Sequence, residues 1–292
     1  MKVAVLGATG TIGRALVPEL ARRHEVVAIA RRPGPDADGV TWRAADATDE
    51  DALREALEGV EVVHHLVHSL GSPDFEERDR RAADAVARAA AAVGARQIVY
   101  LGGLGDDAPD LSPHLRSRAE TAERLAAGSV PVTTLRAAMI VGRGSAAFET
   151  VRALVERLPG MICPRWVSTE TQPIALADVV RYLAGVTGCE AAYGETYDLG
   201  GPEVMTYRTM IERIARLRGR RPLIIEVPIL SPRLSSLWLH LVTPVRAGVA
   251  RPLVEGLKNP TVARDTRIRE LVPFEPTPFD AAAREAFEPD RS

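Results

Sequence analysis

Three glycines, each three residues after the last, directly follow a short apolar run near the start of the chain. The run is Val3 to Leu6, and the glycines are Gly7, Gly10 and Gly13. Apolar residues then recur at helical spacing, which predicts a strand, a tight turn and a helix N-terminus. The backbone of such a turn can approach a pyrophosphate, and the positive end of the helix dipole faces the anion. A tight turn that binds nothing is the alternative. The expected contacts are Gly7, Thr9, Gly10, Thr11, Ile12 and Gly13.

Two arginines follow the second apolar run. Glu25 to Ala30 has the composition of a buried strand, and Arg31 and Arg32 come directly after it. At this point of a dinucleotide-binding fold, an acid binds a ribose 2′-hydroxyl, whereas an arginine accommodates a 2′-phosphate. The pair therefore favours NADP(H) over NAD(H). Solvated loop charges with no ligand are the alternative.

An aspartate follows the short third strand, which is expected over Val40 to Ala44. In the corresponding loop of such folds a carboxylate often reaches the adenine amine, so Asp46 and the adjacent Ala47 are expected cofactor contacts. The alternative is that Asp46 caps a turn, or the helix expected near Asp49 to Leu57. The residues leave both roles open.

A fourth strand is expected over Val60 to His68. Ligands sit at the carboxyl ends of strands in open parallel sheets, so Leu66, Val67 and His68 are expected beside the nicotinamide-side ribose. His68 is also a candidate proton donor, and a histidine bonded to neighbouring backbone is the alternative. Two histidines further back in the strand are expected to be buried and structural, namely His64 and His65.

Strands and helices continue to alternate after this point. A helix is predicted from Phe75 to Ala92, and its charged segment, Glu76 to Arg81, is expected to form a solvated face. Further strands are expected over Gln97–Leu101 and Val130–Ile140. The alternation predicts an α/β fold, a Rossmann-type doubly wound parallel sheet with a smaller, mainly helical C-terminal substrate region. We assign residues 1–144, with a return segment at about 173–200, to NADP(H) binding, and residues 145–172 and 201–292 to the substrate and a lid.

These motifs together resemble the atypical and extended short-chain dehydrogenase/reductases. The similarity is greatest to NmrA-like and complex-I-39-kDa-subunit-like NAD(P)H-binding proteins, above all their bacterial reductase-like members, and it covers residues 1 to about 220. It implies a Rossmann fold that binds NAD(P)H, with Ala137 among the contacts. The matching segments are Gly7-x-x-Gly10-x-x-Gly13, Arg31-Arg32, Asp46, Leu135–Gly142, Gln172–Val180 and Glu195–Val204.

The usual catalytic pair of that wider family is absent. Its catalytic members carry Tyr-x-x-x-Lys, in which tyrosine donates a proton and lysine binds the ribose and lowers the tyrosine pKa. Here His114 stands in place of the tyrosine and Arg118 in place of the lysine, while Gly102 and Gly103 occupy the region of a serine. Arg118 can hold ribose hydroxyls but cannot act as an acid. His114 can protonate an alkoxide or enolate near neutral pH, unless it only caps its helix or faces solvent.

The C-terminal part supplies candidate substrate contacts. A helix is predicted over Phe148–Leu158, then a loop over Pro159–Val167 that contains Trp166. A strand is expected over Ile224–Leu230, followed by an apolar helical stripe that contains Trp238. The stripe has three interpretations, namely core packing, a lid over an apolar substrate, and a dimer or membrane-surface face. We favour the lid, which makes Trp166 and Trp238 the candidate substrate contacts.

Composition excludes several classes of protein. The 292 residues carry a net charge of -2, which argues against general electrostatic binding to nucleic acid. Cys163 and Cys189 form no CxxC motif and no Cys/His spacing, so a reduced, cytoplasmic protein without a structural metal is expected. No apolar run reaches the about 18 residues of a membrane span.

The leading hypothesis is an NADP(H)-dependent reductase of a small, largely apolar carbonyl or activated-alkene compound. Arg118 would orient the nicotinamide ribose, with His114 or His68 as the acid. The alternative is a non-catalytic NADP(H)-binding redox sensor or assembly partner. A sugar-nucleotide epimerase or dehydratase comes third, since the tyrosine is missing. The expected partner is a small-molecule substrate, and a homodimer is compatible with the apolar stripe.

Overall fold

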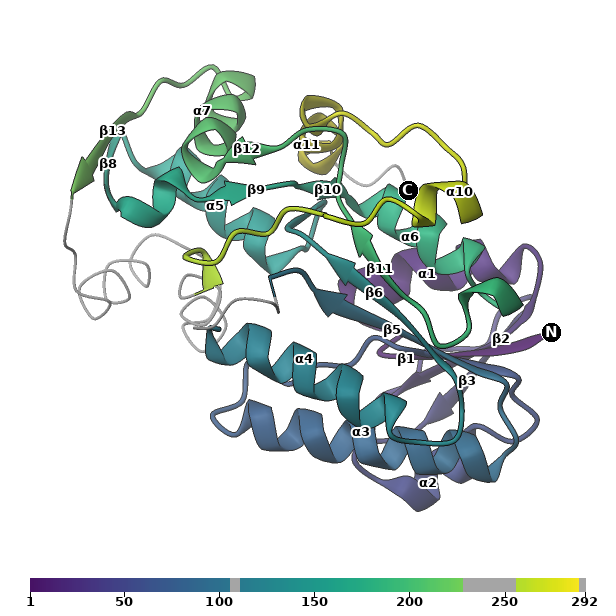
Figure 1. Cartoon of the computed structure of the whole chain (residues 1–292). Coiled ribbons are helices and arrows are strands. Elements are labelled where there is room, and N and C mark those ends of the chain that lie inside the picture. The colour runs from purple at the N-terminus through teal and green to yellow at the C-terminus, as the bar shows by residue number, and fades with distance from the viewer. Residues whose placement is uncertain (106–110, 228–255, 289–292) are drawn as a thin grey trace.

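Seven parallel strands form the central sheet of the computed structural model, which describes residues 1–105, 111–227 and 256–288 (Figure 1). Their spatial order is β11-β6-β5-β4-β1-β2-β3, so the order of the chain reverses at β1. Within the described residues, no helix combines the length and apolar character needed to cross a membrane. The strands are β1 (Lys2–Leu6), β2 (Glu25–Ala30), β3 (Val40–Ala44), β4 (Val62–His65), β5 (Gln97–Gly103), β6 (Val132–Ala137) and β11 (Thr196–Leu199).

Helices cover both faces of this sheet. Helices α1 (Thr11–Ala21) and α6 (Leu176–Gly185) lie against one face, and α2 (Glu50–Ala56), α3 (Phe75–Ala92) and α4 (Pro113–Ala126) against the other (Figure 1). Local sequence explains where two of them begin. The Asp49 carboxylate accepts a hydrogen bond from the Ala52 amide at the start of α2, and Ser112 caps α4 in the same way. The predicted doubly wound Rossmann-type fold is confirmed.

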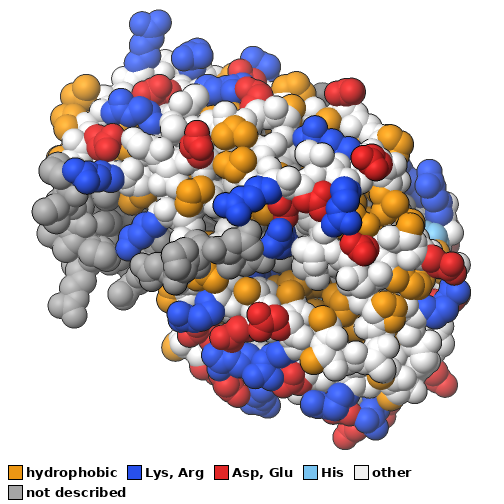
Figure 2. Space-filling model, viewed as in Figure 1, with side chains coloured by type: hydrophobic (Ala, Val, Ile, Leu, Met, Phe, Trp, Pro, Cys, Tyr) orange, Lys and Arg blue, Asp and Glu red, His pale blue; other side chains and the backbone are white. Residues whose placement is uncertain are grey.

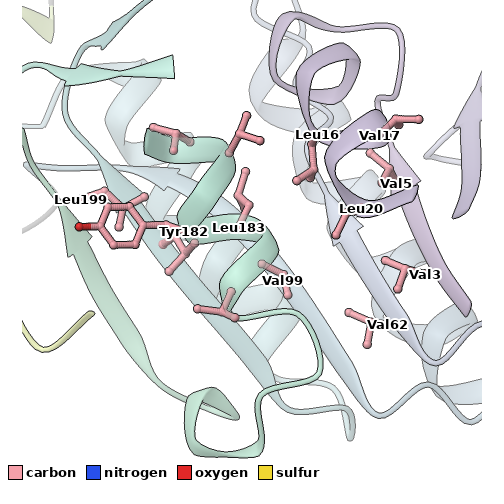
Figure 3. Close-up of a cluster of buried hydrophobic side chains, with 14 of the residues drawn as sticks. Val3, Val5, Leu16, Val17, Leu20, Val62, Val99, Tyr182, Leu183 and Leu199 are labelled. Atoms are coloured by element: carbon pink, nitrogen blue, oxygen red, sulfur yellow. The ribbon is translucent and has the colours of Figure 1, made fainter. Parts of the chain in front are cut away.

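Each face of the sheet has its own apolar core. On the α1 side, Leu16 and Leu20 of the helix lie over Val3 and Val5 of β1, together with Tyr182 and Leu183 of α6 (Figure 3). The opposite core joins β1, β2, β4 and β5 to the alanine-rich side of α3. Because both faces are covered, the central strands are continuous apolar runs rather than alternating ones.

The remaining described residues form a smaller region beside the carboxyl ends of the strands. Its helices α5 (Ala146–Arg157), α7 (Tyr207–Leu217) and α11 (Phe279–Phe287) pack around a third core. Short elements complete it, namely η1 (Arg165–Ser168) and the strand pairs β7 (Ile140–Val141) with β10 (Ile174–Ala175), β9 (Glu170–Thr171) with β12 (Met205–Thr206), and β8 (Gly160–Pro164) with β13 (Leu223–Val227). Two other short helices, η2 (Glu190–Ala192) and α10 (Ile268–Leu271), pack instead on the α1-side core of the main sheet.

Three predictions of local structure are wrong in part. The segment predicted as a loop, Pro159–Val167, contains strand β8 and helix η1, because β8 pairs with β13 from Gly160 opposite Leu223 onwards. The single strand expected over Val130–Ile140 is two strands, since the chain leaves the main sheet after β6 and β7 pairs with β10. The strand expected over Val60–His68 is confined to Val62–His65.

Acidic and basic side chains are interspersed over the face shown in Figure 2, in keeping with a net charge of -2. Helices α3 and α4 illustrate the pattern, with ion pairs between Glu76 and Arg116, between Arg80 and Glu120, and between Asp84 and Arg124. Because these side chains are about a third to a half exposed, each pair contributes little to stability.

Candidate functional site

Glycine is required in the turn between β1 and α1 because backbone atoms meet there. The φ angle of Gly7 is +86°, in the left-handed region that favours glycine. A Cβ on Gly7 would lie 3.2 Å from the carbonyl carbon and oxygen of Leu66, and one on Gly13 would lie 2.4 Å from the Gly7 oxygen. The turn is therefore a cradle of backbone atoms with no room for a side chain at position 7 or 13.

The helix N-terminus beyond this turn is open to an anion. Gly10 is the N-cap of α1, and no side chain of the described residues caps the helix or places an acid in its first turn. The Thr11 hydroxyl instead donates a 2.8 Å hydrogen bond to the carbonyl of Gly144, after β7. The cradle also lies where the strand order reverses, the position at which open α/β sheets bind nucleotides. These residues fit a pyrophosphate.

A pocket of about 920 Å³ extends from the glycine turn into the smaller region. The ends of β5 and β6 contribute to its wall through Leu101, Gly103 and Ala137. Its volume falls in the range of small-molecule and cofactor sites. On the side of the smaller region the lining is mainly apolar, and we call this part of the pocket the apolar chamber. Its residues include Met139, Ile140, Val151, Leu154, Met161, Ile162, Cys163, Trp166, Tyr207 and Ile211.

One cation and two histidines line this pocket, namely Arg118, His114 and His68, and its described lining contains no acid. Arg118 makes no ion pair within the described residues. Withdrawal from water, followed by the Arg118 charge, lowers the pKa of His114 to about 3. His68 is exposed, and the guanidinium is the main cause of its lowered pKa. Both imidazoles are therefore neutral at physiological pH.

The predicted burial of His64 and His65 is confirmed, with exposed fractions of 0% and 1%. His64 Nε2 lies 3.0 Å from Thr187 Oγ1, and the His65 ring stacks on Tyr100 with centroids 5.8 Å apart. Burial lowers the pKa of each to about 3. Neither Nδ1 has a hydrogen-bond partner within the described residues. The two side chains are structural, but each is bonded less completely than expected.

The structure brings most of the predicted site residues together. The pocket is lined by Gly7, Gly10, Thr11, Ile12, Gly13, Leu66, His68, His114, Arg118, Ala137 and Trp166. Trp166 is half-buried and meets Tyr207 edge-on, with ring centroids 6.1 Å apart. Ser112 rather than His114 caps α4, so the capping alternative for His114 is wrong. Trp238 lies outside the described residues.

Other predicted contacts lie outside the pocket lining, and all of them except Thr9 of the glycine turn follow β2, β3 or β4. Arg31 and Arg32 are exposed directly after β2. Asp46 accepts hydrogen bonds from the Thr48 amide and hydroxyl at 3.0 and 2.8 Å, which lower its pKa. It therefore caps a turn through Oδ1, while its Oδ2 lies 4.0 Å from a guanidinium nitrogen of Arg78. The others are Thr9, which is exposed, and Ala47 and Val67, which are half-buried.

Asp79 corrects the prediction for the charged start of α3. Its neighbours in the segment Glu76 to Arg81 are exposed or half-buried, as expected, but Asp79 is only 7% exposed. Helical periodicity was the available signal, because Ala82, Ala83 and Val86 share its face and are buried. The apolar chamber residues carry no comparable signal, since they come from scattered elements.

The sequence profile of NAD(P)H-binding proteins matches residues 7–155, about half of the chain. The chain belongs to the NAD(P)H-binding family. A relative from Streptomyces griseus, (4-alkanoyl-5-oxo-2,5-dihydrofuran-3-yl)methyl phosphate reductase, is 31% identical in an alignment of 229 residues that covers 75% of this chain and 74% of the relative. The chloroplastic divinyl chlorophyllide a 8-vinyl-reductase of Oryza sativa subsp. indica is 32% identical over 250 residues, 78% of this chain and 61% of the plant protein.

A solved structure shares the fold of this NAD(P)H-binding protein over its whole length. The NADPH-dependent quinone oxidoreductase of Escherichia coli, solved with NADPH, superposes with a TM-score of 0.77. The alignment covers 99% of this chain and 100% of the other at 23% sequence identity. At this identity the likeness shows a shared fold.

Proposed function

We propose that the protein is an NADPH-dependent reductase of a small, largely apolar compound that carries a carbonyl group or an activated alkene. One observation carries the proposal. A single pocket joins the glycine turn to an apolar chamber, and its only described charged side chain is Arg118, beside two neutral histidines. Convergent polar groups in an apolar pocket are typical of a site that orients a reacting group.

The cofactor would be held by the residues around the turn. The backbone of Gly7 to Gly13 and the open end of α1 suit the pyrophosphate. Leu66, Val67 and Arg118 would face the nicotinamide-side ribose, and Arg31 and Arg32 would pair with the 2′-phosphate. When bound, a reduced nicotinamide supplies a hydride. Residues 1–144 and 173–200 would thus hold the cofactor, and the smaller region, with Trp166, the substrate.

The protein would stabilise the negative charge that develops on the substrate oxygen. The Arg118 guanidinium and the N–H groups of neutral His114 and His68 are hydrogen-bond donors in a mainly apolar site, where such donors are most effective. A neutral imidazole holds no imidazolium proton to give, so His114 would act as a hydrogen-bond donor. The proton would then come from water at the exposed side of the pocket, beside His68.

The two curated relatives support this class of reaction. One is named as the reductase of a dihydrofuranyl-methyl phosphate and the other as the reductase of a vinyl group. Both names describe reductions, which favours reduction over the epimerase or dehydratase hypothesis. They leave the substrate of this chain to experiment.

Cofactor binding is the first test. Nucleotide-stripped protein is titrated with NADPH and, separately, with NADH, and we expect a clear preference for NADPH. Oxidation of NADPH is then followed with a panel of enones, quinones and ketones, where His114→Ala and Arg118→Gln should each lower turnover at least about 10-fold. Binding to neither nucleotide would overturn the proposal. Tight binding without turnover on any compound, together with a nucleotide-dependent protein partner, would instead favour the non-catalytic sensor.

A further inference from the structure

A buried carboxylate connects the two segments that carry the polar groups of the pocket. Asp79 lies in α3, outside the pocket lining, and is 7% exposed. Its Oδ1 accepts a hydrogen bond from the Ser69 amide at 2.8 Å, and its Oδ2 accepts one from the Ser117 hydroxyl at 3.0 Å. Each oxygen therefore holds a different element.

The two bonded serines are neighbours of the pocket residues. Ser69 directly follows His68 in the loop after β4, and Ser117 directly precedes Arg118 in α4, one turn after His114. The loop and the helix are separated by more than forty residues of chain. The Asp79 carboxylate thus links the residue that follows His68 to the residue that precedes Arg118.

This arrangement differs from the other contacts between α3 and α4. The pairs Asp84–Arg124 and Glu76–Arg116 are exposed ion pairs. Asp79, in contrast, is buried and makes no ion pair with any described residue. Burying a carboxylate is costly unless hydrogen bonds compensate for the lost water, and bonds to a charged acceptor are the strong ones. The two bonds therefore hold their partners more firmly than a surface pair would.

A second contact holds Arg118 from the side of the sheet. The hydroxyl of Tyr100 in β5 donates a 3.1 Å hydrogen bond to the Arg118 carbonyl. The Arg118 backbone is thus anchored by β5, and the adjacent Ser117 by α3. With the helix held at both points, the hydrogen bond from the Ser69 amide to Asp79 links the loop that carries His68 to that helix.

We infer that Asp79 is a positioning residue, which holds His68 in register with Arg118 and His114 so that their donors converge on one ligand oxygen. The inference rests on the proposed function for the identity of that oxygen. The geometric part, that Asp79 holds the His68 loop against α4, is independent of the proposed function and can be measured in the protein without turnover. A displacement of a catalytic group by about 1 Å can lower the rate about 100-fold, so the position of His68 is expected to affect turnover.

The test compares three variants. Asp79→Asn keeps both bonds, because its amide oxygen can accept from the Ser69 amide and its amide nitrogen can donate to the Ser117 hydroxyl. Asp79→Leu removes both. Asp84→Ala is the matched control, since it removes an α3–α4 contact of the same helix far from the pocket lining. Turnover of the best substrate should fall about 30-fold in kcat/KM for Asp79→Leu and less than about 3-fold for the other two, with the Kd for NADPH little changed.

A readout without turnover separates this inference from the proposed function. The pKa of His68 is followed by NMR in each variant, with and without NADPH. Arg118 lowers the pKa of His68, so a loop that moves away raises it in Asp79→Leu. Loss of the negative charge of Asp79 without movement of the loop would lower the pKa of His68. Asp79→Asn should therefore show no rise in the pKa of His68. If no compound is turned over, this comparison still decides the role of Asp79.

Two outcomes would overturn the inference. One is a His68 titration and a kcat/KM in Asp79→Leu that match those of Asp79→Asn. The other is a loss in Asp79→Asn as large as in Asp79→Leu, which would make the charge and not the geometry decisive. If Asp79→Leu does not fold, Ser117→Ala removes one of the two bonds at a small helical side chain. It should lower kcat/KM about 5-fold and raise the pKa of His68 in the same direction.

Discussion

Gly13 packs directly against the backbone carbonyl of Gly7, with no side chain between the two residues. A Cβ on Gly13 would lie 2.4 Å from the Gly7 carbonyl oxygen and 2.7 Å from the Ala8 Cα, closer than real Cβ atoms approach. The same Gly7 oxygen accepts a 2.9 Å hydrogen bond from the Gly10 amide, which closes the turn. A side chain at position 13 must therefore open the turn that faces the anion.

Gly13→Ala is expected to weaken NADPH binding at least about 10-fold and to lower the free energy of unfolding by about 1 to 3 kcal/mol, the usual effect of overpacking. Isothermal titration and chemical unfolding measure the two effects. Gly10→Ala is the comparison, because its Cβ would meet only the Gly7 oxygen at 3.2 Å. It should lose less stability. Wild-type affinity in Gly13→Ala would show that the turn does not hold the pyrophosphate.

Replacement of Arg31 and Arg32 by alanine should lower the affinity for NADPH about 10-fold and leave the affinity for NADH unchanged. The reason is that arginine pairs with a 2′-phosphate through charge-assisted hydrogen bonds, which NADH does not offer. Titration with each nucleotide gives the ratio. Arg23→Ala provides the control, since Arg23 is also exposed but lies after α1. An unchanged ratio of NADPH affinity to NADH affinity in the double variant would show that the two arginines do not contact the 2′-phosphate.

The pH profile of reduction tests the state of His114. Its pKa is lowered to about 3, so the side chain stays neutral from pH 5 to 8, and kcat/KM should show no inflection near 6.5 that belongs to it. His114→Gln, which keeps an N–H donor, should retain more activity than His114→Leu. Steady-state kinetics across this range measures both. A wild-type decline through pH 6.5 that disappears in His114→Gln would identify an imidazolium acid instead.

Acid should destabilise the fold through His65. Its pKa in the folded state is about 3, against about 6.5 in the unfolded chain, so below pH 6.5 the unfolded chain binds the proton more readily. The stability present above pH 6.5 is lost as the pH falls, by up to about 2 kcal/mol per histidine at pH 5. His65→Phe keeps a ring against Tyr100 and should lose less between pH 7.5 and 5 in chemical unfolding. Equal losses in both proteins would contradict this.

Most of the nucleotide-binding half can be predicted because strands that are buried on both faces appear in the sequence as apolar runs. Strands β1 and β2 are covered on both faces, so they are unbroken apolar runs in the sequence. The glycine spacing requires a close backbone approach, and His64 and His65 lie within an apolar strand. These signals are local, and each agrees with the alternation of strands and helices.

The features that the sequence does not predict depend on contacts between residues far apart in the chain. Strand β8 has an apolar run of only three residues, Met161 to Cys163, between a glycine and a proline, and it pairs with β13, some sixty residues later. The charged residues around Asp79 predict that it is solvated, although the helical face that it shares with Ala82, Ala83 and Val86 is apolar. The lining of the chamber comes from several separate elements, so no spacing in the sequence could identify it. Pairing and burial over long separations are visible only in the folded chain.

The return of the chain to the edge of the main sheet has a consequence for dissecting the protein. Strand β11 pairs with β6 only after the chain has passed through α5, β8 and α6. A fragment ending at β7 would lack this neighbour and leave the carbonyl and amide groups of β6 unpaired along an open edge. It would also lack α6, whose Tyr182 and Leu183 cover the α1 face. Such a fragment should aggregate, and the nucleotide-binding half can be separated only by rejoining the chain across the excised substrate region.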